Sequence, residues 1–243
     1  MSRFYYDLHT HSCLSPCADG DNTPNNLLGM ASLSGIDILA LTDHNSCKNC
    51  PALFRAAERY GVIPVAGMEL TTSEDIHVVC LFETLSDAMA FDEEIAKRRV
   101  LIKNRPDIFG EQLILDGDDN VIGKEEHLLT NATTVSIEDV PALVAMYNGI
   151  CYPAHIDRSS NGIIAILGTL PPTPHFDCVE IRSPELVGEY CEKYDLSGKQ
   201  IIVSSDAHML TDVHDKDSYL ELSADRQDGG AVRRELIRLL GRR

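Results

Sequence analysis

The sequence predicts an α/β fold in which short, buried, parallel strands alternate with helices. Five apolar runs rich in Val and Ile have the length and composition of such strands: 3–6, 36–41, 62–66, 149–152 and 200–204. Strand–helix–strand succession favours right-handed crossovers, which place neighbouring strands parallel. Because 243 residues match the size of one α/β barrel domain, we expect residues 1–243 to form a single domain.

Capping residues and glycines delimit the helices between these strands. Thr23 followed by Pro24 is typical of a helix N-terminus, and Gly35 is typical of the C-terminal end of the same helix. Apolar residues at helical spacing, with similar end signals, predict further helices at about 53–61, 86–105 and 136–149.

The strands can be counted along the chain by where they end. Seven predicted strands end near Leu8, Leu41, Met68, Phe82, Ala154, Ile181 and Ser205, and residues 219–222 are a candidate eighth or edge strand. Residues 106–135 interrupt the alternation. Within them, 112–115 and 121–122 flank a turn rich in Asp, Gly and Asn, which predicts a β-hairpin. We interpret this segment as an insertion between the fourth and fifth strands that overhangs the site.

Charge and hydropathy limit the partners of the protein. The net charge of −17 argues against long nucleic acid, because phosphate backbones are held mainly by Lys and Arg. No apolar stretch reaches the roughly 18 residues that cross a bilayer, and the N-terminus lacks a signal-peptide pattern. We therefore expect a cytoplasmic protein without a membrane partner, in which the eight cysteines are reduced thiols. Cys47 and Cys50 have zinc-like spacing, which is a weak indication of a separate metal cluster.

Imidazole and carboxylate side chains follow the predicted strands. They are His9, His11, His44, Glu69, His77, His155, Asp206 and His208, of which His77 lies inside an apolar run. His9 and His11 are two residues apart on a strand, so both imidazoles are expected to point the same way. Groups at the same end of several parallel strands can meet around one point, as at the mouth of a β/α barrel. Since unpaired buried imidazoles and carboxylates are costly, the set predicts a metal centre.

The ligand types indicate both the metals and the reaction. Nitrogen and carboxylate ligands without a thiolate majority suit Zn²⁺, Mn²⁺ or Fe²⁺. Adjacent ions about 3.5–4 Å apart can clamp a phosphoryl group and lower the pKa of an attacking water. No other residue pattern in the chain indicates a nucleophile with its own base, so hydrolysis by water is the expected reaction.

These residues resemble the signature of the PHP family, the polymerase and histidinol phosphatase superfamily of metal-dependent phosphoesterases. The matching motifs are His9-Thr10-His11, Thr42-Asp43-His44, Glu69 with the strand starting at His77, His155, and Asp206-Ala207-His208. The resemblance covers nearly the whole chain. It implies a distorted (β/α)7, TIM-like barrel with two or three divalent ions at the C-terminal ends of the strands.

The resemblance also implies how the ligands divide among three metal sites. The first would use His9, His11, Glu69 and Asp206; the second Glu69, His77 and His155; the third His44, His208 and a residue of the loop after His11. Family members place His or Asp in that loop, whereas this chain reads Ser15-Pro16-Cys17-Ala18-Asp19. The last ligand is therefore Cys17 or Asp19. Spacing favours Cys17, whose thiolate would bind Zn²⁺ well.

Other polar residues receive supporting roles. The predicted catalytic residues are Glu69, Asp206, His208 and Arg158. Arg158 is also the first candidate to bind substrate phosphate and Arg182 the second, because a guanidinium fits two phosphate oxygens. Asp7 and Asp43 are expected to orient imidazoles without binding metal. The remaining loop histidines are interpreted as surface residues, with His127 also a candidate substrate contact: His127, His175 and His214.

We therefore expect a metal-dependent phosphoesterase that acts on a small phosphorylated metabolite or nucleotide. An exonuclease or nucleoside-bisphosphate phosphatase acting on short nucleic acid is the alternative among enzymes. A non-catalytic metal- or ligand-binding module is the alternative outside catalysis, although the near-complete ligand set argues against it. A third hypothesis, a cysteine-based cluster or redox protein, depends on the cysteines near the first two strands: Cys13, Cys17, Cys47 and Cys50.

Overall fold

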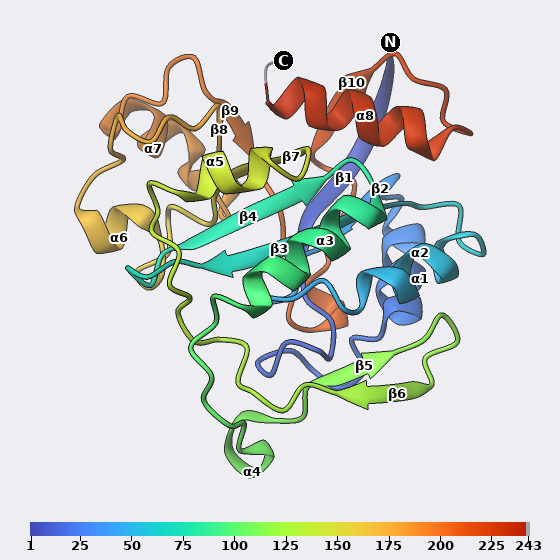
Figure 1. Cartoon of the computed structure of the whole chain (residues 1–243). Coiled ribbons are helices and arrows are strands. Elements are labelled where there is room, and N and C mark those ends of the chain that lie inside the picture. Colours follow the sequence, from blue (N-terminus) through green and yellow to red (C-terminus); the bar gives the residue numbers. More distant parts are fainter. Residues whose placement is uncertain (242–243) are drawn as a thin grey trace.

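The computed structural model describes residues 1–241 and has a curled, six-stranded mixed sheet surrounded by helices (Figure 1). The strand order is β10-β1-β2-β3-β4-β7. These strands are β1 (Ser2–Thr10), β2 (Ile38–Leu41), β3 (Ile63–Thr71), β4 (His77–Phe82), β7 (Gly149–Pro153) and β10 (Tyr219–Leu222). A separate parallel pair consists of β8 (Cys178–Glu180) and β9 (Gln200–Ile202).

Eight α-helices occur in residues 1–241. They are α1 (Pro24–Ser34), α2 (Cys50–Ala57), α3 (Leu85–Ala96), α4 (Pro106–Phe109), α5 (Val140–Ala145), α6 (Ile163–Leu167), α7 (Val187–Lys193) and α8 (Gly229–Leu240). The predicted ends of α1 are confirmed, since the Thr23 side chain accepts from the Asn26 N–H and Gly35 is left-handed with φ 75°. None of the helices in this part of the chain has both the length and the apolar character of a membrane span.

The predicted all-parallel sheet is wrong at β4. Strands β1, β2 and β3 are parallel to one another, but β4 pairs antiparallel with both β3 and β7, and β10 pairs antiparallel with β1. Only residues 72–76 separate β3 from β4. A parallel connection needs about a dozen residues or more, so this short segment can form only a hairpin. The start of β4 therefore lies beside the end of β3.

The chain after β9 returns to the end of β1. Thr10 and Ala207 form an isolated parallel bridge, and the His11 N–H donates to the Ala207 carbonyl at 3.0 Å. The α/β class is confirmed, and the large sheet is curled. In the regular strand pairing, however, β8 and β9 remain separate from the six-stranded sheet.

Two apolar clusters lie on opposite faces of the sheet. One includes Leu27, Leu53 and Phe91, which come from α1, α2 and α3. The other contains residues near the starts of several strands, such as Phe4 and Ile63, together with four residues of α8: Val232, Leu236, Ile237 and Leu240. Because α8 packs at this end of the sheet, the opposite ends of the strands remain available for polar side chains (Figure 1).

The predicted hairpin is present as the antiparallel pair β5 (Leu113–Leu115) and β6 (Val121–Lys124). It packs against the start of α2, where the Asn49 side chain donates to the Leu113 carbonyl and accepts from the Leu115 N–H. The Leu113 N–H also donates to the Cys13 carbonyl at 3.0 Å. The hairpin is thus anchored beside the loop after β1, and α4 of the same segment borders a cavity with Cys17.

Candidate metal centre

An irregularity in β1 turns the first two histidines toward the other polar residues. The pairing of β1 with β2 advances from Asp7 to Thr10 while β2 advances by only two residues, from Leu39 to Leu41. One extra residue in a strand reverses which face the following side chains occupy. Leu8 packs in the apolar cluster that includes residues of α8. In a regular strand the next side chain, that of His9, would point to the opposite face, but it lies close to Glu69 on the same side. The expected common direction of His9 and His11 is confirmed, since their Nε2 atoms lie 3.1 Å apart.

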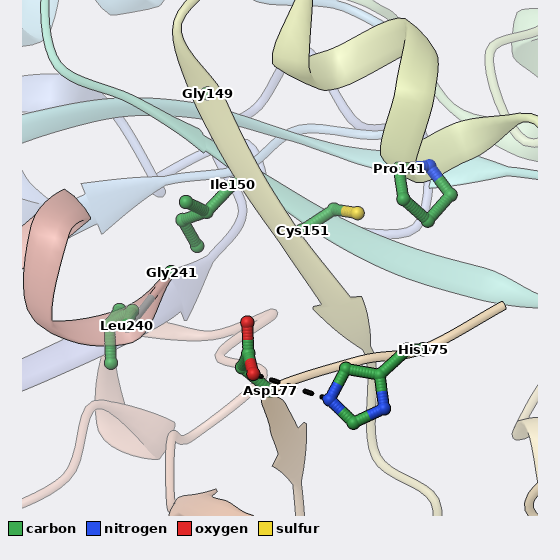
Figure 2. A pocket seen from close by; sticks show the side chains of 8 residues that line it. All are labelled: Pro141, Gly149, Ile150, Cys151, His175, Asp177, Leu240 and Gly241. Carbon is green, nitrogen blue, oxygen red and sulfur yellow. Dashed lines mark hydrogen bonds and ion pairs between the residues drawn. The ribbon is translucent and has the colours of Figure 1, made fainter. Parts of the chain in front are cut away.

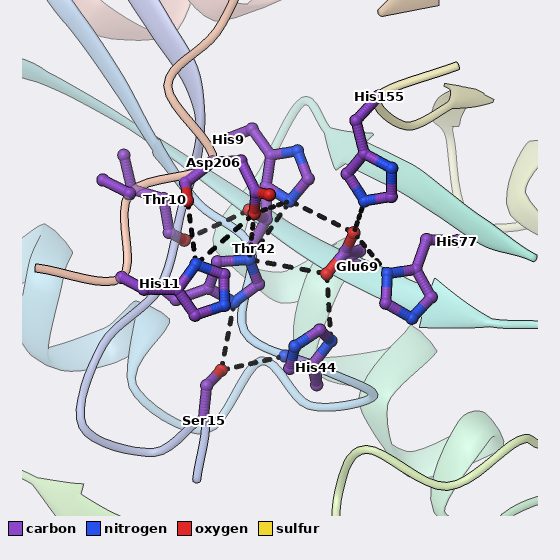
Figure 3. A network of polar contacts seen from close by, with 12 residues as sticks. His9, Thr10, His11, Ser15, Thr42, His44, Glu69, His77, His155 and Asp206 are labelled. Atoms are coloured by element: carbon purple, nitrogen blue, oxygen red, sulfur yellow. Dashed lines mark hydrogen bonds and ion pairs between the residues drawn. The ribbon is translucent and has the colours of Figure 1, made fainter. Parts of the chain in front are cut away.

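Glu69 lies at the centre of the cluster (Figure 3). It sits near the end of β3, fully buried, with five imidazoles around its carboxylate. The distances to its oxygens are 3.3 Å from His9 Nε2, 3.4 Å from His11 Nε2, 2.9 Å from His44 Nδ1, 2.8 Å from His77 Nδ1 and 2.9 Å from His155 Nε2. His77 reaches Glu69 because it is the first residue of the antiparallel β4 and pairs with Thr71.

Asp206 provides a second buried carboxylate at the same place. Its Oδ1 lies 3.5 Å from His9 Nε2 and 3.2 Å from His11 Nε2. Both Asp206 and His155 have a positive φ, 53° and 26° respectively, so the backbone turns sharply where each strand region ends. Such conformations are uncommon outside glycine and occur often at functional sites.

The donor set fits divalent metal ions. Three groups have ligand atoms close enough to hold an ion: His9, His11, Glu69 and Asp206; His44, Glu69 and His77; and His11, His44 and His208. Several of their buried atoms have no properly aligned hydrogen-bond partner even where another polar atom is near: His44 Nδ1, Glu69 Oε2, His77 Nδ1 and Asp206 Oδ1. Buried polar groups in this condition are costly, and a shared cation would satisfy them together.

These groups resemble the three implied ligand sets with two differences. The first set is reproduced in full. In the second, His44 replaces His155, although His155 remains hydrogen-bonded to Glu69 at 2.9 Å. In the third, His11 stands with His44 and His208 where the resemblance implied Cys17 or Asp19, so neighbouring sets share imidazoles as well as Glu69.

Cys17 and Asp19 occupy different positions relative to the cluster. The Cys17 thiol contacts His44 and His208, whereas the exposed Asp19 carboxylate accepts from the Asp21 N–H at 2.8 Å. Partial desolvation would raise the pKa of Cys17, but the two histidines lower it to about 6. Cys17, which is exposed, therefore stands at the solvent side of the cluster beside two of its imidazoles.

Neighbouring imidazoles stabilise the ionised form of the two buried carboxylates. Burial would raise the pKa of Glu69, but His77, His9 and His44 lower it well below its usual range. The pKa of Asp206 is likewise lowered, against the effect of burial, by the nearby imidazoles of His9 and His11. Both groups are thus held as anions, the form that binds cations.

Glu180 is a residue of this site that the sequence did not lead us to expect. It ends β8, is fully buried, and its Oε1 lies 2.8 Å from His9 Nδ1. The same oxygen accepts from the His155 N–H at 3.0 Å. The available signal was a single carboxylate inside the apolar run 178–181, where an isolated charge implies a buried partner.

The expected role of Asp7 is wrong, and that of Asp43 is indirect. Asp7 accepts from backbone groups, among them the Ser205 N–H at 3.1 Å, so it ties the loop after β9 to β1. Asp43 accepts from the Ser15 hydroxyl at 2.7 Å, and that hydroxyl lies 3.1 Å from His11 Nδ1. Asp43 thus acts on an imidazole through Ser15.

The two predicted phosphate-binding arginines differ in position. Arg158 donates to Asp206 Oδ2 at 2.8 Å, and its side chain is 35% exposed, so it lies at the rim of the cluster. Arg182 is exposed and its Nε donates to the Ser205 carbonyl at 3.2 Å. Of the two arginines, Arg158 therefore lies in the better position to contact a phosphate at the cluster.

The remaining histidines and cysteines lie outside the cluster. His175 pairs with Asp177 beside a cavity of about 150 Å³ at the start of β7, the end of that strand away from His155 (Figure 2). His127 and His214 are partly exposed. Cys13, Cys47 and Cys50 are buried free thiols, and the metal-binding groups found within residues 1–241 contain no cysteine. This geometry does not support a cysteine-based cluster in that part of the chain.

Comparison with known proteins places the chain in a family. A family model described as PHP domain matches residues 7–148, more than half of the chain. Over 116 residues the chain is 28% identical to a 5′-3′ exoribonuclease of Haemophilus influenzae, an alignment that covers 46% of this chain and 38% of that relative.

Solved structures with the same fold include proteins of different sizes. The lesion-specific endonuclease PfuEndoQ of Pyrococcus furiosus has a TM-score of 0.55 at 13% identity, over 86% of this chain and 49% of that one. A protein of Bifidobacterium adolescentis, provisionally named a metal-dependent phosphoesterase, has a TM-score of 0.54 at 17% identity over 96% of both chains. The resemblance inferred from the motifs is confirmed: the chain belongs to the PHP domain family, a family of phosphoester hydrolases.

Proposed function

We propose that the protein is a metal-dependent phosphoesterase that uses water to hydrolyse a phosphate ester. The observation that carries the proposal is the buried Glu69 carboxylate, which has five imidazole nitrogens within 2.8–3.4 Å. One carboxylate shared by so many nitrogen donors is the arrangement expected where adjacent divalent ions are bridged. Zn²⁺, Mn²⁺ and Fe²⁺ suit these donors, two or three ions in number.

The proposed ligands include the seven residues of the three groups above: His9, His11, His44, Glu69, His77, Asp206 and His208. We add His155, which is hydrogen-bonded to Glu69, and Cys17, which lies beside His44 and His208, as further proposed ligands. Bound ions would polarise a phosphoryl oxygen and lower the pKa of the attacking water.

The rim of the cluster provides a way to orient the phosphate. Arg158 lies against Asp206 and is partly exposed, so its remaining N–H groups can donate to phosphate oxygens. His208 is also partly exposed and contacts Cys17, which places it on the solvent side, where substrate would enter. We assign Arg158 to phosphate binding and His208 to the substrate side of the metal centre.

A small substrate fits the charge of the protein. The net charge of −17 opposes the approach of long polyanions, whereas bound cations would reverse the potential locally. The exoribonuclease and endonuclease named above act on nucleic acid, which favours a nucleotide or short oligonucleotide as the alternative to a phosphorylated metabolite.

Metal analysis combined with hydrolysis assays tests the proposal. Purified protein reconstituted with Mn²⁺ or Zn²⁺ should bind these ions, unfold at a higher temperature than chelated protein, and release phosphate from mononucleotides or p-nitrophenyl phosphate. Glu69→Gln and Asp206→Asn should lose metal and turnover together. Asp215→Asn, which changes an exposed carboxylate of the following loop, is the matched control. Metal binding without turnover across a broad panel of phosphate esters would favour a non-catalytic module instead.

A further inference from the structure

A cavity of about 260 Å³ lies next to the metal centre. It is lined by Pro16, Cys17, Ile108, Phe109 and Thr130. Cys17 belongs both to this cavity and to the edge of the cluster, because its thiol contacts His44 and His208. A molecule whose phosphate reached the cluster could therefore extend its other end into the cavity.

The lining of the cavity suits an uncharged group. Apart from Cys17, whose thiol lies beside His44 and His208, none of the lining residues is ionisable, although the protein as a whole is strongly acidic. Ile108 and Phe109 are 56% and 44% exposed, which leaves a large apolar side chain and an aromatic ring open to solvent. A phosphate or carboxylate would find no cationic partner here, whereas a planar ring could stack on Phe109.

The wall that carries Phe109 is fixed to the loop of Cys17. Gly110 follows the last residue of α4 and has φ 87°, and a Cβ at this position would lie 3.0 Å from the Pro16 carbonyl oxygen. The Asn104 side chain donates to the Gly110 carbonyl at 2.9 Å. This close packing of backbone on backbone sets the separation between the two walls.

We infer that this cavity binds the planar, uncharged ring of the substrate, with a nucleobase as the chemical class, while the phosphate lies at the metal centre. The inference deepens the proposed function and rests on it for the position of the phosphate. The Thr130 hydroxyl is the one side-chain oxygen in the lining, so the cavity offers little to a sugar. The segment 106–130 thus contributes to substrate selection.

Adenosine 5′-monophosphate and ribose 5-phosphate separate the ring from the phosphate, since the second lacks only the base. The wild-type protein should show a lower KM for the nucleotide. Phe109→Ala should raise that KM about tenfold, with a much smaller change in kcat and in the kcat/KM for ribose 5-phosphate. Phe109→Tyr should retain the preference, because the aromatic ring remains. Leu101→Ala changes an exposed apolar residue of the same region outside the cavity and is the control.

The outcomes distinguish this inference from the proposed function. If the wild-type protein hydrolyses both compounds with equal KM, or if Phe109→Ala changes both equally, the ring site is refuted while the phosphoesterase stands. If neither compound nor any other phosphate ester is hydrolysed, the proposed function fails. Calorimetric titration with adenosine then decides the ring site alone: binding that Phe109→Ala weakens supports it, and absence of binding refutes it.

Discussion

Nδ1 of His9 lies 2.8 Å from Oε1 of Glu180, and both side chains are fully buried. Because a carboxylate only accepts, Nδ1 of His9 donates to Glu180, and Nε2 is the nitrogen that faces Glu69 and Asp206. Glu180 therefore fixes the orientation of the His9 ring, in the way that outer carboxylates orient metal-binding imidazoles in general.

Glu180→Ala should lower metal affinity by about 10- to 100-fold, because His9 loses its fixed orientation and the His155 N–H loses its acceptor. Metal titration and elemental analysis measure this directly, independent of activity. Glu180→Gln retains an acceptor oxygen, so its metal affinity should lie between those of the wild-type protein and the alanine variant. Glu189→Ala, at an exposed position in α7, should behave as wild type. Full metal occupancy in Glu180→Ala would contradict the orienting role.

Arg158→Ala should lower kcat/KM for a phosphate ester by about 100-fold, since a bidentate contact to phosphate is lost. Metal content should change little, because Asp206 keeps its two imidazole neighbours. Arg158→Lys should restore only part of the activity, as an ammonium cannot reproduce the planar pair of donors. Arg55→Ala, which removes an exposed partner of Glu58, serves as the control in the same steady-state assay.

The Glu125 carboxyl should make the free energy of unfolding depend on pH. Burial would raise its pKa, but Arg99 and Lys48 lower it to about 2. Since the folded pKa lies below the unfolded value of 4.5, the stabilisation is complete above pH 4.5 and is lost as the pH falls toward 2. Glu125→Gln should therefore cost about 1–2 kcal/mol at pH 7 and progressively less below pH 4.5.

Urea unfolding at pH 7 and pH 3 measures that difference. Glu111→Gln removes a carboxylate that pairs with Lys124 at an exposed position of the same segment, and it should have little effect at either pH. An equal loss of stability for Glu125→Gln at both pH values would argue against the linkage.

Gly67→Ala should destabilise the strand that carries Glu69. A Cβ at this position would lie 2.7 Å from the Cys80 carbonyl, 2.8 Å from Leu81 and 2.9 Å from Thr42, so the paired strands would have to separate. We expect a loss of about 1–3 kcal/mol in the free energy of unfolding, with weaker metal binding as a consequence. Gly123→Ala in β6 is the control, because a Cβ at that position would make only ordinary contacts at 3.6 Å or more. Comparing the two variants by thermal unfolding isolates the steric effect.

Local features of the fold could be predicted from the sequence because neighbouring residues determine them. Thr23 and Gly35 mark the ends of α1, and a turn rich in Asp, Gly and Asn marks the β5–β6 hairpin. The antiparallel direction of β4 was also accessible, because residues 72–76 are too few for a parallel crossover. The single-domain organisation remains a prediction.

The sequence by itself determined which side chains are available to the site, their order along the chain, and hence the family. The tertiary structure alone decided how they meet: an extra residue between Asp7 and Thr10 turns His9 inward, and Glu180 reaches it from 171 residues away. Periodicity and capping are local properties, readable from a few residues. Convergence of these side chains around Glu69 depends on the curl of the sheet and on backbone turns at His155 and Asp206, which only long-range packing can impose.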